Sequence, residues 1–526
     1  MSLTRNVCCP STPTKTAGFA KVQPHFRALF PNNRYNRTLL LVHGKQNTNP
    51  LETTLVVYRP KGLGKLSDRW SLSTGIVTFA PRVTFFWGFK VTLNALSMVM
   101  KKSPTNSSGL QVRFSHAERY QREFRDFCLD ELVREDHQVR TLWSYVCRLD
   151  LTAFHAPYKA VAGKAGRKPV DPRILLTLWL MATLEGISSG RRLAVLCQRD
   201  NVYRWICGDV GVNRNLLNDF RVSHADALQG LMSQTIASLQ HQGLIDFNRV
   251  SQDGVRVRAN AGKSSFRKKP TLEELSQEAE KAVEKVLEVA DDNTTNQEAA
   301  AGLHAAEDRQ RRLEQALKEH ELLAKKREKR KKGDGEKTRT STTDPDARVM
   351  KMADGGFRPA MNIQVATLNG SRIVVAVEAI NEGTDSGQMK PMLDHIEAEF
   401  GERPKEILAD GGYNSRQDVT EVQQSTTMVY SPVRSARNKA IDPYAPRRGD
   451  TKEVIQWRQR MKTEEAQEIY AQRCSTAEFP FMRFRNHGLQ QLPVRGLTKA
   501  KVIGIWHAIV SNFQQIITQG WLSAVT

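Results

Sequence analysis

The 526-residue sequence predicts an α/β protein whose mixed sheet is flanked by helices, preceded by a helical domain and interrupted by an inserted helical hairpin. Apolar residues recur at spacings of three and four over 115–245, which is typical of helices. Alternating or continuous apolar runs at 247–261, 360–380 and 404–413 indicate strands, and a helical pattern at 384–401 lies between the last two. A helix placed between strands in this way indicates an α/β sheet.

The charge balance favours a polyanionic partner. Lys and Arg number 78 against 56 Asp and Glu, which gives a formal net charge of +22. Nucleic acid is favoured over a membrane surface, because cations along a phosphate backbone gain affinity by releasing counterions. The alternative is a protein that is merely basic, with a solvated surface.

Cysteine usage and hydropathy indicate a reducing compartment. The seven cysteines are scattered, with no CxxC pair and no Cys/His ligand spacing, so no structural zinc is expected. The longest apolar run, at 174–187, is too short and too interrupted to span a bilayer. The N-terminus lacks the continuous apolar core of a secretory signal.

Residues 1–97 differ from the rest of the chain in composition. They hold two acids, Glu52 and Asp68, against 13 Lys and Arg residues, and show no sustained helical or strand period. One interpretation is a basic arm that holds DNA. The favoured interpretation is sequence upstream of the true start, with Met98 or Met100 as first residue, because acid depletion without patterning is not typical of a folded domain.

Two helix starts carry capping signals. Asp171 is expected to be the N-cap of a helix that has Pro172 at its first position. The helix over 384–401 is expected to be capped by Thr384 or Asp385 and to end at a glycine.

The helices of 115–245 are short, with tight breaks, and carry several arginines that could be exposed. These arginines are Arg191, Arg192, Arg199 and Arg221. The combination predicts a helix-turn-helix-like DNA-binding bundle. Any small helical domain would give a similar pattern, which is the alternative.

A charged insert at 266–339 separates the first strand from the others. An apolar stripe at helical spacing starts at Leu272, and a second stripe follows a turn at 291–296, so we expect an antiparallel helical hairpin. Its basic end at 325–332 could grip phosphates or could be a solvated helix end, and both stay open. The hairpin itself is expected to be a spacer, with binding to DNA ends or to a partner protomer as the alternative.

Two aspartates interrupt or end strand patterns, and each precedes a glycine. Asp253 lies inside the first strand, Asp410 ends the fourth, and Glu478 lies on a late helix. Because carboxylates are rarely buried unless paired or metal-bound, three oxygen ligands meeting at a sheet suggest Mg²⁺ or Mn²⁺ and phosphodiester chemistry. The glycines would leave room for a nucleic-acid backbone. On turn chemistry alone, a strand-end Asp is more often a turn former.

Five sequence blocks carry a resemblance to a known family. They are "DPRILLTLWLMATLEGISSGRRL", "VSQDGVRVRANAGKSSFRK", "STTDPDARVMKMADGGFRPAMNIQVAT", "ILADGGYNS" and "RNHGLQQLPVRGLTKAKVIGIWHAIVSNF". Together they resemble the bacterial insertion-sequence transposases of the DDE superfamily, which have a ribonuclease H-like catalytic core. The resemblance runs from about residue 115 to the C-terminus. It implies a DNA-binding domain at 115–245 and a catalytic domain made of 246–265 and 340–526.

The resemblance also implies the residues of the site. Asp253, Asp410 and Glu478 match the three acids, which would be catalytic and would hold Mg²⁺ (or Mn²⁺), as two ions. In the helical domain, Arg191 and Arg192 would contact DNA.

A family signature surrounds the third acid and would also contact DNA. Tyr470, Arg473 and Arg485 match it, although Arg485 stands where Lys is common elsewhere in the superfamily. Pro480 lacks an N–H and could kink the helix where Glu478 must aim. On physical grounds alone, three nearby carboxylates compete with it, namely Glu464, Glu465 and Glu468.

The function implied is that of a transposase that binds terminal inverted repeats, cleaves DNA strands and transfers them to target DNA, as a homodimer or higher oligomer. A bacterial cytoplasmic, nucleoid-associated location is expected. One alternative is an inactive or co-opted DNA-binding protein derived from a transposase, and another is a nuclease that does not join strands. The persistence of all three acids favours the active transposase.

Overall fold

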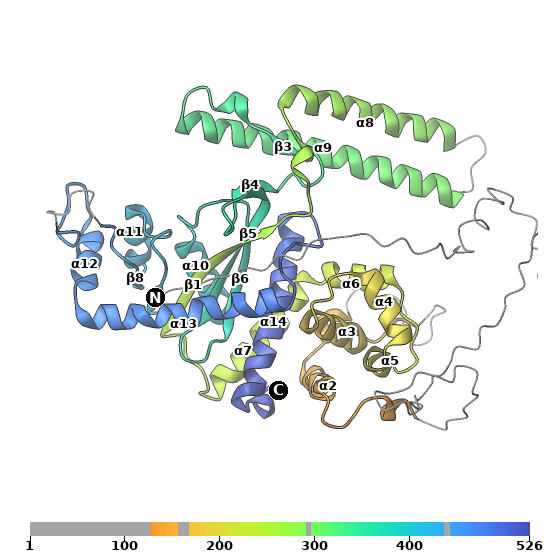
Figure 1. Cartoon of the computed structure of the whole chain (residues 1–526), viewed down its shortest axis with the longest axis horizontal. Coiled ribbons are helices and arrows are strands. Elements are labelled where there is room, and N and C mark those ends of the chain that lie inside the picture. The colour runs from red at the N-terminus through yellow and green to blue at the C-terminus, as the bar shows by residue number, and fades with distance from the viewer. Residues whose placement is uncertain (1–127, 156–167, 291–295, 436–441, 526) are drawn as a thin grey trace, which may run out of the picture. The chain divides into compact units, whose positions relative to one another are not determined.

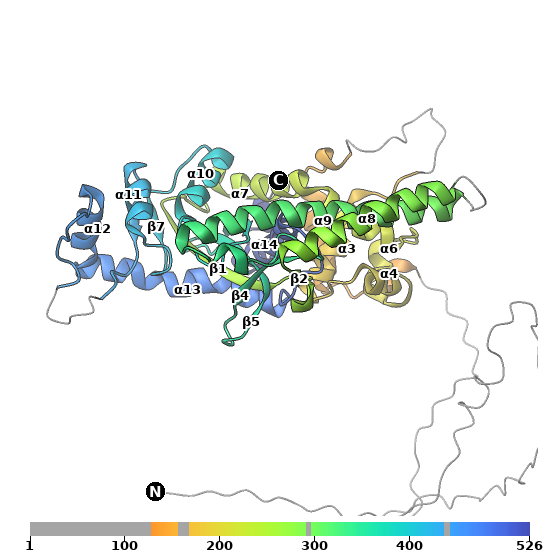
Figure 2. The same ribbon diagram turned by 90° about the horizontal axis from the view of Figure 1, so that it is seen from above.

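The computed structural model describes residues 128–155, 168–290, 296–435 and 442–525, which are drawn in colour in Figures 1 and 2. The predictions for 1–97, and for Met98 or Met100 as the start, lie outside these residues, as do the first residues of the predicted helical domain. None of the described helices is long and apolar enough to cross a membrane.

The described chain up to His241 is helical, as the apolar spacing predicts. Its helices are α2 (Gln138–Arg148), α3 (Pro172–Leu184), α4 (Gly190–Arg199), α5 (Asn201–Cys207), α6 (Arg214–Ser223) and α7 (Ala225–His241). Asp171 caps α3 as predicted, accepting the Arg173 N–H at 2.8 Å. Asp200 and Asn213 cap α5 and α6 in the same way. Because each cap satisfies free N–H groups, the helices can follow one another closely.

One mixed sheet of six strands lies in the described part of the chain, in the order β4-β5-β1-β7-β8, with β6 also paired to β5. The strands are β1 (Arg249–Arg258), β4 (Arg348–Lys351), β5 (Phe357–Leu368), β6 (Val374–Ile380), β7 (Glu406–Leu408) and β8 (Met428–Tyr430). β1, β5 and β6 are antiparallel neighbours, whereas β7 runs parallel to β1 and β8 runs parallel to β7. The predicted α/β class with a mixed sheet is therefore confirmed.

Two helices cover opposite faces of this sheet. Gln252 on β1 donates to the Gln388 carbonyl at 3.0 Å, at the start of α10 (Met389–Phe400). The next residue, Asp253, pairs with Arg473 on α13 (Glu464–Asn486) at 2.8 Å. Since consecutive strand residues point to opposite faces, α10 and α13 lie on either side of β1, as Figure 2 shows.

The helical region and the sheet share one hydrophobic core. The long helix α14 (Leu497–Gln519) packs against α3, α7 and β6, and most of its residues are buried. Asn512 on this helix accepts the N–H of Val374 and donates to its carbonyl, both at 2.8 Å, at the start of β6. α14 therefore fixes the sheet and the helices relative to each other.

The insert forms the predicted pair of helices, α8 (Lys269–Ala290) and α9 (Asn296–Arg330), which lie side by side in both views (Figures 1 and 2). Leu272 and Ala279 pack against Leu313 and Ala316 in a small core of their own, separate from the main one. A two-stranded sheet, β2 (Phe266–Arg267) with β3 (Thr340–Ser341), closes the base of the insert.

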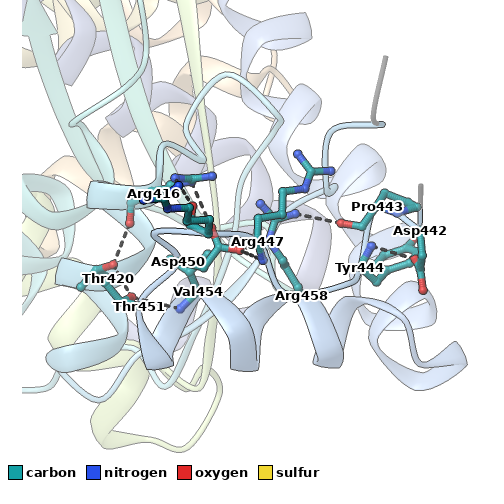
Figure 3. A network of polar contacts seen from close by, with 11 residues as sticks. Arg416, Thr420, Asp442, Pro443, Tyr444, Arg447, Asp450, Thr451, Val454 and Arg458 are labelled. Carbon is teal, nitrogen blue, oxygen red and sulfur yellow. Dashed lines mark hydrogen bonds and ion pairs between the residues drawn. The ribbon is translucent and has the colours of Figure 1, made fainter. Parts of the chain in front are cut away.

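An ion cluster around the buried Asp450 holds the residues just before α12 (Lys452–Met461) against α11 (Arg416–Gln424), as Figure 3 shows. The Asp450 side chain is fully buried and lies 3.0 Å from Arg416 Nε and 2.9 Å from Arg458 Nε. The backbone N–H of Arg447 also donates to Asp450 at 2.9 Å. This cluster ties the segment that leads into α12 to α11.

Candidate active site

Asp253 lies on β1, and Asp410 lies two residues beyond the end of the neighbouring parallel strand β7. β1 and β7 pair Ser251 with Leu408, and two further residues in the same register bring Asp253 level with Asp410. The two carboxylates are close enough that the charge of Asp410 raises the pKa of Asp253. The structure thus brings together two of the three predicted acids, which lie 157 positions apart in the sequence.

Asp253 is mostly buried and has one cationic partner. Its Oδ1 accepts the Gly254 N–H at 2.8 Å, and its Oδ2 lies 2.8 Å from the Arg473 guanidinium. Burial raises the pKa of Asp253 to about 6, although Arg473 opposes the shift, and the charges of Asp410 and Asp385 add to it. The site therefore holds more negative charge than Arg473 alone offsets.

Asp410 makes the turn contact that the sequence gave as one alternative, and it also lies near Asp253. Its Oδ1 accepts the N–H of Gly412 at 2.6 Å, which is turn chemistry at the end of a strand. A Cβ at Gly412 would lie 2.8 Å from that oxygen, so a larger residue there would displace the Asp410 carboxylate. The same carboxylate still acts on Asp253 across the strand pair.

Gly254 has a different role from the expected one. A Cβ there would lie 2.8 Å from both Asn362 Oδ1 and Asp385 Oδ1, and still closer to the Gln364 amide. The prediction that this glycine leaves room for a nucleic-acid backbone was wrong, because the protein's own polar side chains fill the space.

The helix α13 presents part of the predicted signature to these acids. Tyr470 shares a hydrogen bond with Arg473, and burial raises the Tyr470 pKa while the nearby Arg473 charge lowers it. Arg473 in turn pairs with Asp253. Arg485 is exposed in the last turn of the helix.

Glu478 is also on α13, but it lies apart from Asp253 and Asp410. It is five residues beyond Arg473, about 7.5 Å along and about 140° around the helix, and its side chain is exposed. Its neighbour Ala477 is buried instead. α13 continues through Pro480 to Asn486, so the proline does not end the helix. The competing acids are also exposed, near the start of α13, at Glu464, Glu465 and Glu468.

The structure adds a carboxylate that sequence reasoning did not assign to the site. Asp385 was expected only as a possible cap of α10, but that helix begins at Met389 and has no side-chain cap. Its Oδ1 instead accepts from Asn362 Nδ2 at 2.7 Å and from Gln364 Nε2 at 2.8 Å. The sequence did contain a clue to this contact: the otherwise apolar strand "AMNIQVAT" holds two amide side chains, and buried amides require hydrogen-bond partners.

Two family models match the sequence. A transposase domain of the DUF772 type matches residues 127–223, and a transposase DDE domain matches residues 334–513. The chain belongs to the insertion-sequence DDE transposases. No curated protein and no solved structure matches it. The DDE match includes Asp410 and Glu478, whereas Asp253 precedes it, on the other side of the insert.

DDE transposases bind DNA, transfer polynucleotide strands and generally use a divalent metal such as Mg²⁺. The carboxylates of Asp253, Asp410 and Asp385 act on one another and are of the ligand type that Mg²⁺ prefers, and Arg473 pairs with Asp253. Among the described residues, no three His, Cys, Asp or Glu side chains are arranged to hold a metal by themselves. That is compatible with Mg²⁺, which keeps several waters and takes one or two carboxylates plus substrate phosphates.

The arginines predicted to contact DNA differ in exposure in this transposase. Arg191 and Arg192 are exposed in the first turn of α4. The expectation that Arg221 could be exposed was wrong, because it is 7% exposed, lies 4.4 Å from the Trp179 ring centre and donates to the Ser188 carbonyl at 2.6 Å. Burial lowers the pKa of Arg221 to about 10.

The block "STTDPDARVM" fixes loops of the transposase. Asp344 accepts the Gly496 N–H at 3.2 Å and Asp346 accepts the Leu497 N–H at 2.9 Å, so both hold the start of α14. Arg348 pairs with Glu319 and joins β4 to α9. Asp344 and Arg348 therefore fix loops.

Proposed function

We propose that this transposase binds the terminal inverted repeats of its element, cleaves the DNA strands and transfers the 3′ ends to target DNA. The observation that supports the proposal is the pairing of β1 with β7, because Asp410 follows the end of β7 and its charge acts on Asp253. Support for a ribonuclease H-like core comes from the strand order β6-β5-β1-β7-β8, in which an antiparallel meander is followed by parallel strands.

Asp253, Asp410 and Glu478 would hold Mg²⁺ or Mn²⁺, as two ions. When bound, these ions would activate water or a 3′-hydroxyl and stabilise the leaving oxygen. Asp253 and Asp410 would supply the oxygen ligands from the sheet. Arg473 holds Asp253 in position through its 2.8 Å ion pair and would help neutralise a substrate phosphate beside it.

The basic end of α9 would lead DNA towards this site. Lys326 pairs with Glu382 at 2.5 Å, and Glu382 is three residues from Asp385 in the loop after β6. The exposed cations of this end are Lys325, Lys326, Arg327, Lys329, Arg330, Lys331 and Lys332. Most of them have room to bind phosphates. Arg191, Arg192, Tyr470 and Arg485 would extend the DNA-binding surface.

Salt dependence tests this surface. Replacing Lys329, Arg330, Lys331 and Lys332 with Gln should lower the slope of log affinity against log salt by about 0.9 for each lost phosphate contact. The matched control replaces Lys281 and Lys285, which are exposed on α8. Equal slopes for the two variants would show that this basic end is a solvated helix end that does not bind phosphates.

The catalytic proposal is tested with purified protein, DNA carrying the terminal inverted repeats, and Mg²⁺. Asp253→Asn and Asp410→Asn should abolish cleavage and strand joining while DNA binding persists. Full activity in either variant would reject the site. Binding without cleavage by the unaltered protein would instead favour the DNA-binding derivative, and cleavage without joining would favour a nuclease.

The third acid has a control on its own helix. Glu478→Gln should abolish cleavage, whereas Glu468→Gln, at an exposed carboxylate of the same helix, should leave it intact. The opposite result would identify Glu468 as the third acid in place of Glu478. We propose that a homodimer or higher oligomer pairs the element ends, and sedimentation of the protein with and without repeat DNA tests this. A nucleoid location follows from the proposed DNA substrate.

A further inference from the structure

A small cavity lies between the helical region and the C-terminal helices, away from Asp253 and Asp410. Its volume is about 30 Å³. The residues that line it include Trp179 on α3, Arg221 on α6 and His507 on α14. The helix α14 packs against both α3 and α6 (Figure 1). A cavity of this size has room for about two water molecules or for one monatomic ion.

Arg221 brings a buried positive charge to this cavity. Its guanidinium lies over the Trp179 ring and donates from one terminal nitrogen to the Ser188 carbonyl at 2.6 Å. The Nε atom of Arg221 is buried and has no hydrogen-bond partner. Because a guanidinium carries five N–H donors, Arg221 retains donors that the protein itself does not use.

No carboxylate balances the charge of Arg221 within the described part of the chain. None of the described residues that line the cavity is an Asp or a Glu. Burial lowers the pKa of Arg221 to about 10, and no acidic neighbour opposes that shift. Arg140 differs in this respect, because it also lies over a tryptophan, Trp205, but pairs with Asp130 at 2.9 Å. A buried charge without a partner costs several kcal/mol, so a counter-ion beside Arg221 is favoured.

The second unpartnered group of the lining is His507. It is 7% exposed, and its Nδ1 is buried without a hydrogen-bond partner. Burial, and to a lesser degree the neighbouring His487, lowers the pKa of His507 to about 3, so the ring is neutral near pH 7 and carries one N–H. The lining therefore combines an unbalanced cation with a further donor, and this combination suits an anion.

We propose that this cavity binds one halide-sized anion, chloride in ordinary solution, which balances the charge of Arg221. The cavity volume favours a monatomic anion. Because Arg221 lies on α6 and His507 on α14, the anion links the helical region to the C-terminal helix that also packs on the sheet. This site goes beyond the proposed function and does not depend on it.

The test uses bromide as the probe, with the full-length protein in a gluconate buffer of constant ionic strength. Bound bromide broadens the bromide nuclear magnetic resonance line, and the saturable part of that broadening reports a specific site. We expect this part to fall at least tenfold in Arg221→Gln. The matched control, Arg140→Gln, removes an arginine that lies over a tryptophan but has its own carboxylate, so it should leave the broadening unchanged.

A second readout covers loss of stability in the variants. The melting temperature in chloride is compared with that of the same variant in gluconate, so a destabilised protein still reports binding. The unaltered protein and Arg140→Gln should melt higher in chloride, whereas Arg221→Gln should show no difference between the two salts.

A third measurement needs no variant. Crystals of the unaltered protein soaked in bromide should show an anomalous peak within hydrogen-bonding reach of Arg221. Water alone in the cavity, or saturable broadening that is equal in Arg221→Gln and in the unaltered protein, would overturn the inference. Either result would leave the proposed DNA cleavage by Asp253 and Asp410 standing, because these measurements contain no DNA.

Discussion

Replacing Asp450 with alanine should cost much of the stability of this transposase. The Asp450 side chain is fully buried between Arg416 and Arg458, and Arg458 is itself only 7% exposed (Figure 3). Removal of one partner from a buried ion pair leaves an uncompensated charge, which costs about 3–5 kcal/mol. Arg458 would keep its bond to the Pro443 carbonyl at 2.8 Å, so the lower end of that range is expected.

The matched control is a pair of similar length on the surface. Asp136 lies 2.8 Å from Arg134, but the two side chains are 69% and 84% exposed. Asp136→Ala should therefore cost no more than about 1 kcal/mol. Urea denaturation followed by circular dichroism gives the free energy of unfolding of both variants. Equal losses, or a loss below about 1 kcal/mol for Asp450→Ala, would refute the reasoning that burial decides the strength of these pairs.

Three further outcomes are expected. Asn512→Ala should lower the free energy of unfolding by about 2–5 kcal/mol in urea denaturation, because it leaves a buried N–H and a buried carbonyl of Val374 without hydrogen-bond partners. Burial raises the pKa of Asp344 to about 6, so the contribution of this group to stability is present below pH 4 and is lost as the pH rises through 6. The Asp344→Asn variant should therefore be as stable as the unaltered protein at pH 4. At pH 8 its free energy of unfolding should be higher by up to about 3 kcal/mol. Burial likewise raises the pKa of Asp253 to about 6, so cleavage at subsaturating Mg²⁺ should fall about tenfold per pH unit below 6, and a flat profile from pH 8 to 5 would contradict this.

Local sequence patterns predicted the elements well where a single period or cap decides them. The Asp171–Pro172 start gave α3, the apolar stripe from Leu272 gave the insert helices, and alternating valines gave β1. These signals work because the residues on the apolar face of a helix or strand recur at a fixed spacing along the chain. The cap of α10 was misplaced by several residues, because Asp385 is engaged by two amides of another strand instead.

The sequence by itself determined that this chain is a basic α/β protein with aspartates at positions 253 and 410 and a transposase-like set of motifs. Only the tertiary structure decided which charges meet. It brought the two aspartates near each other, placed Asp385 close to them, buried Arg221 and left Glu478 exposed. The reason is physical: the period of an element fixes which face a side chain takes, whereas its partners come from segments that lie far away along the chain and meet only when the sheet and helices pack.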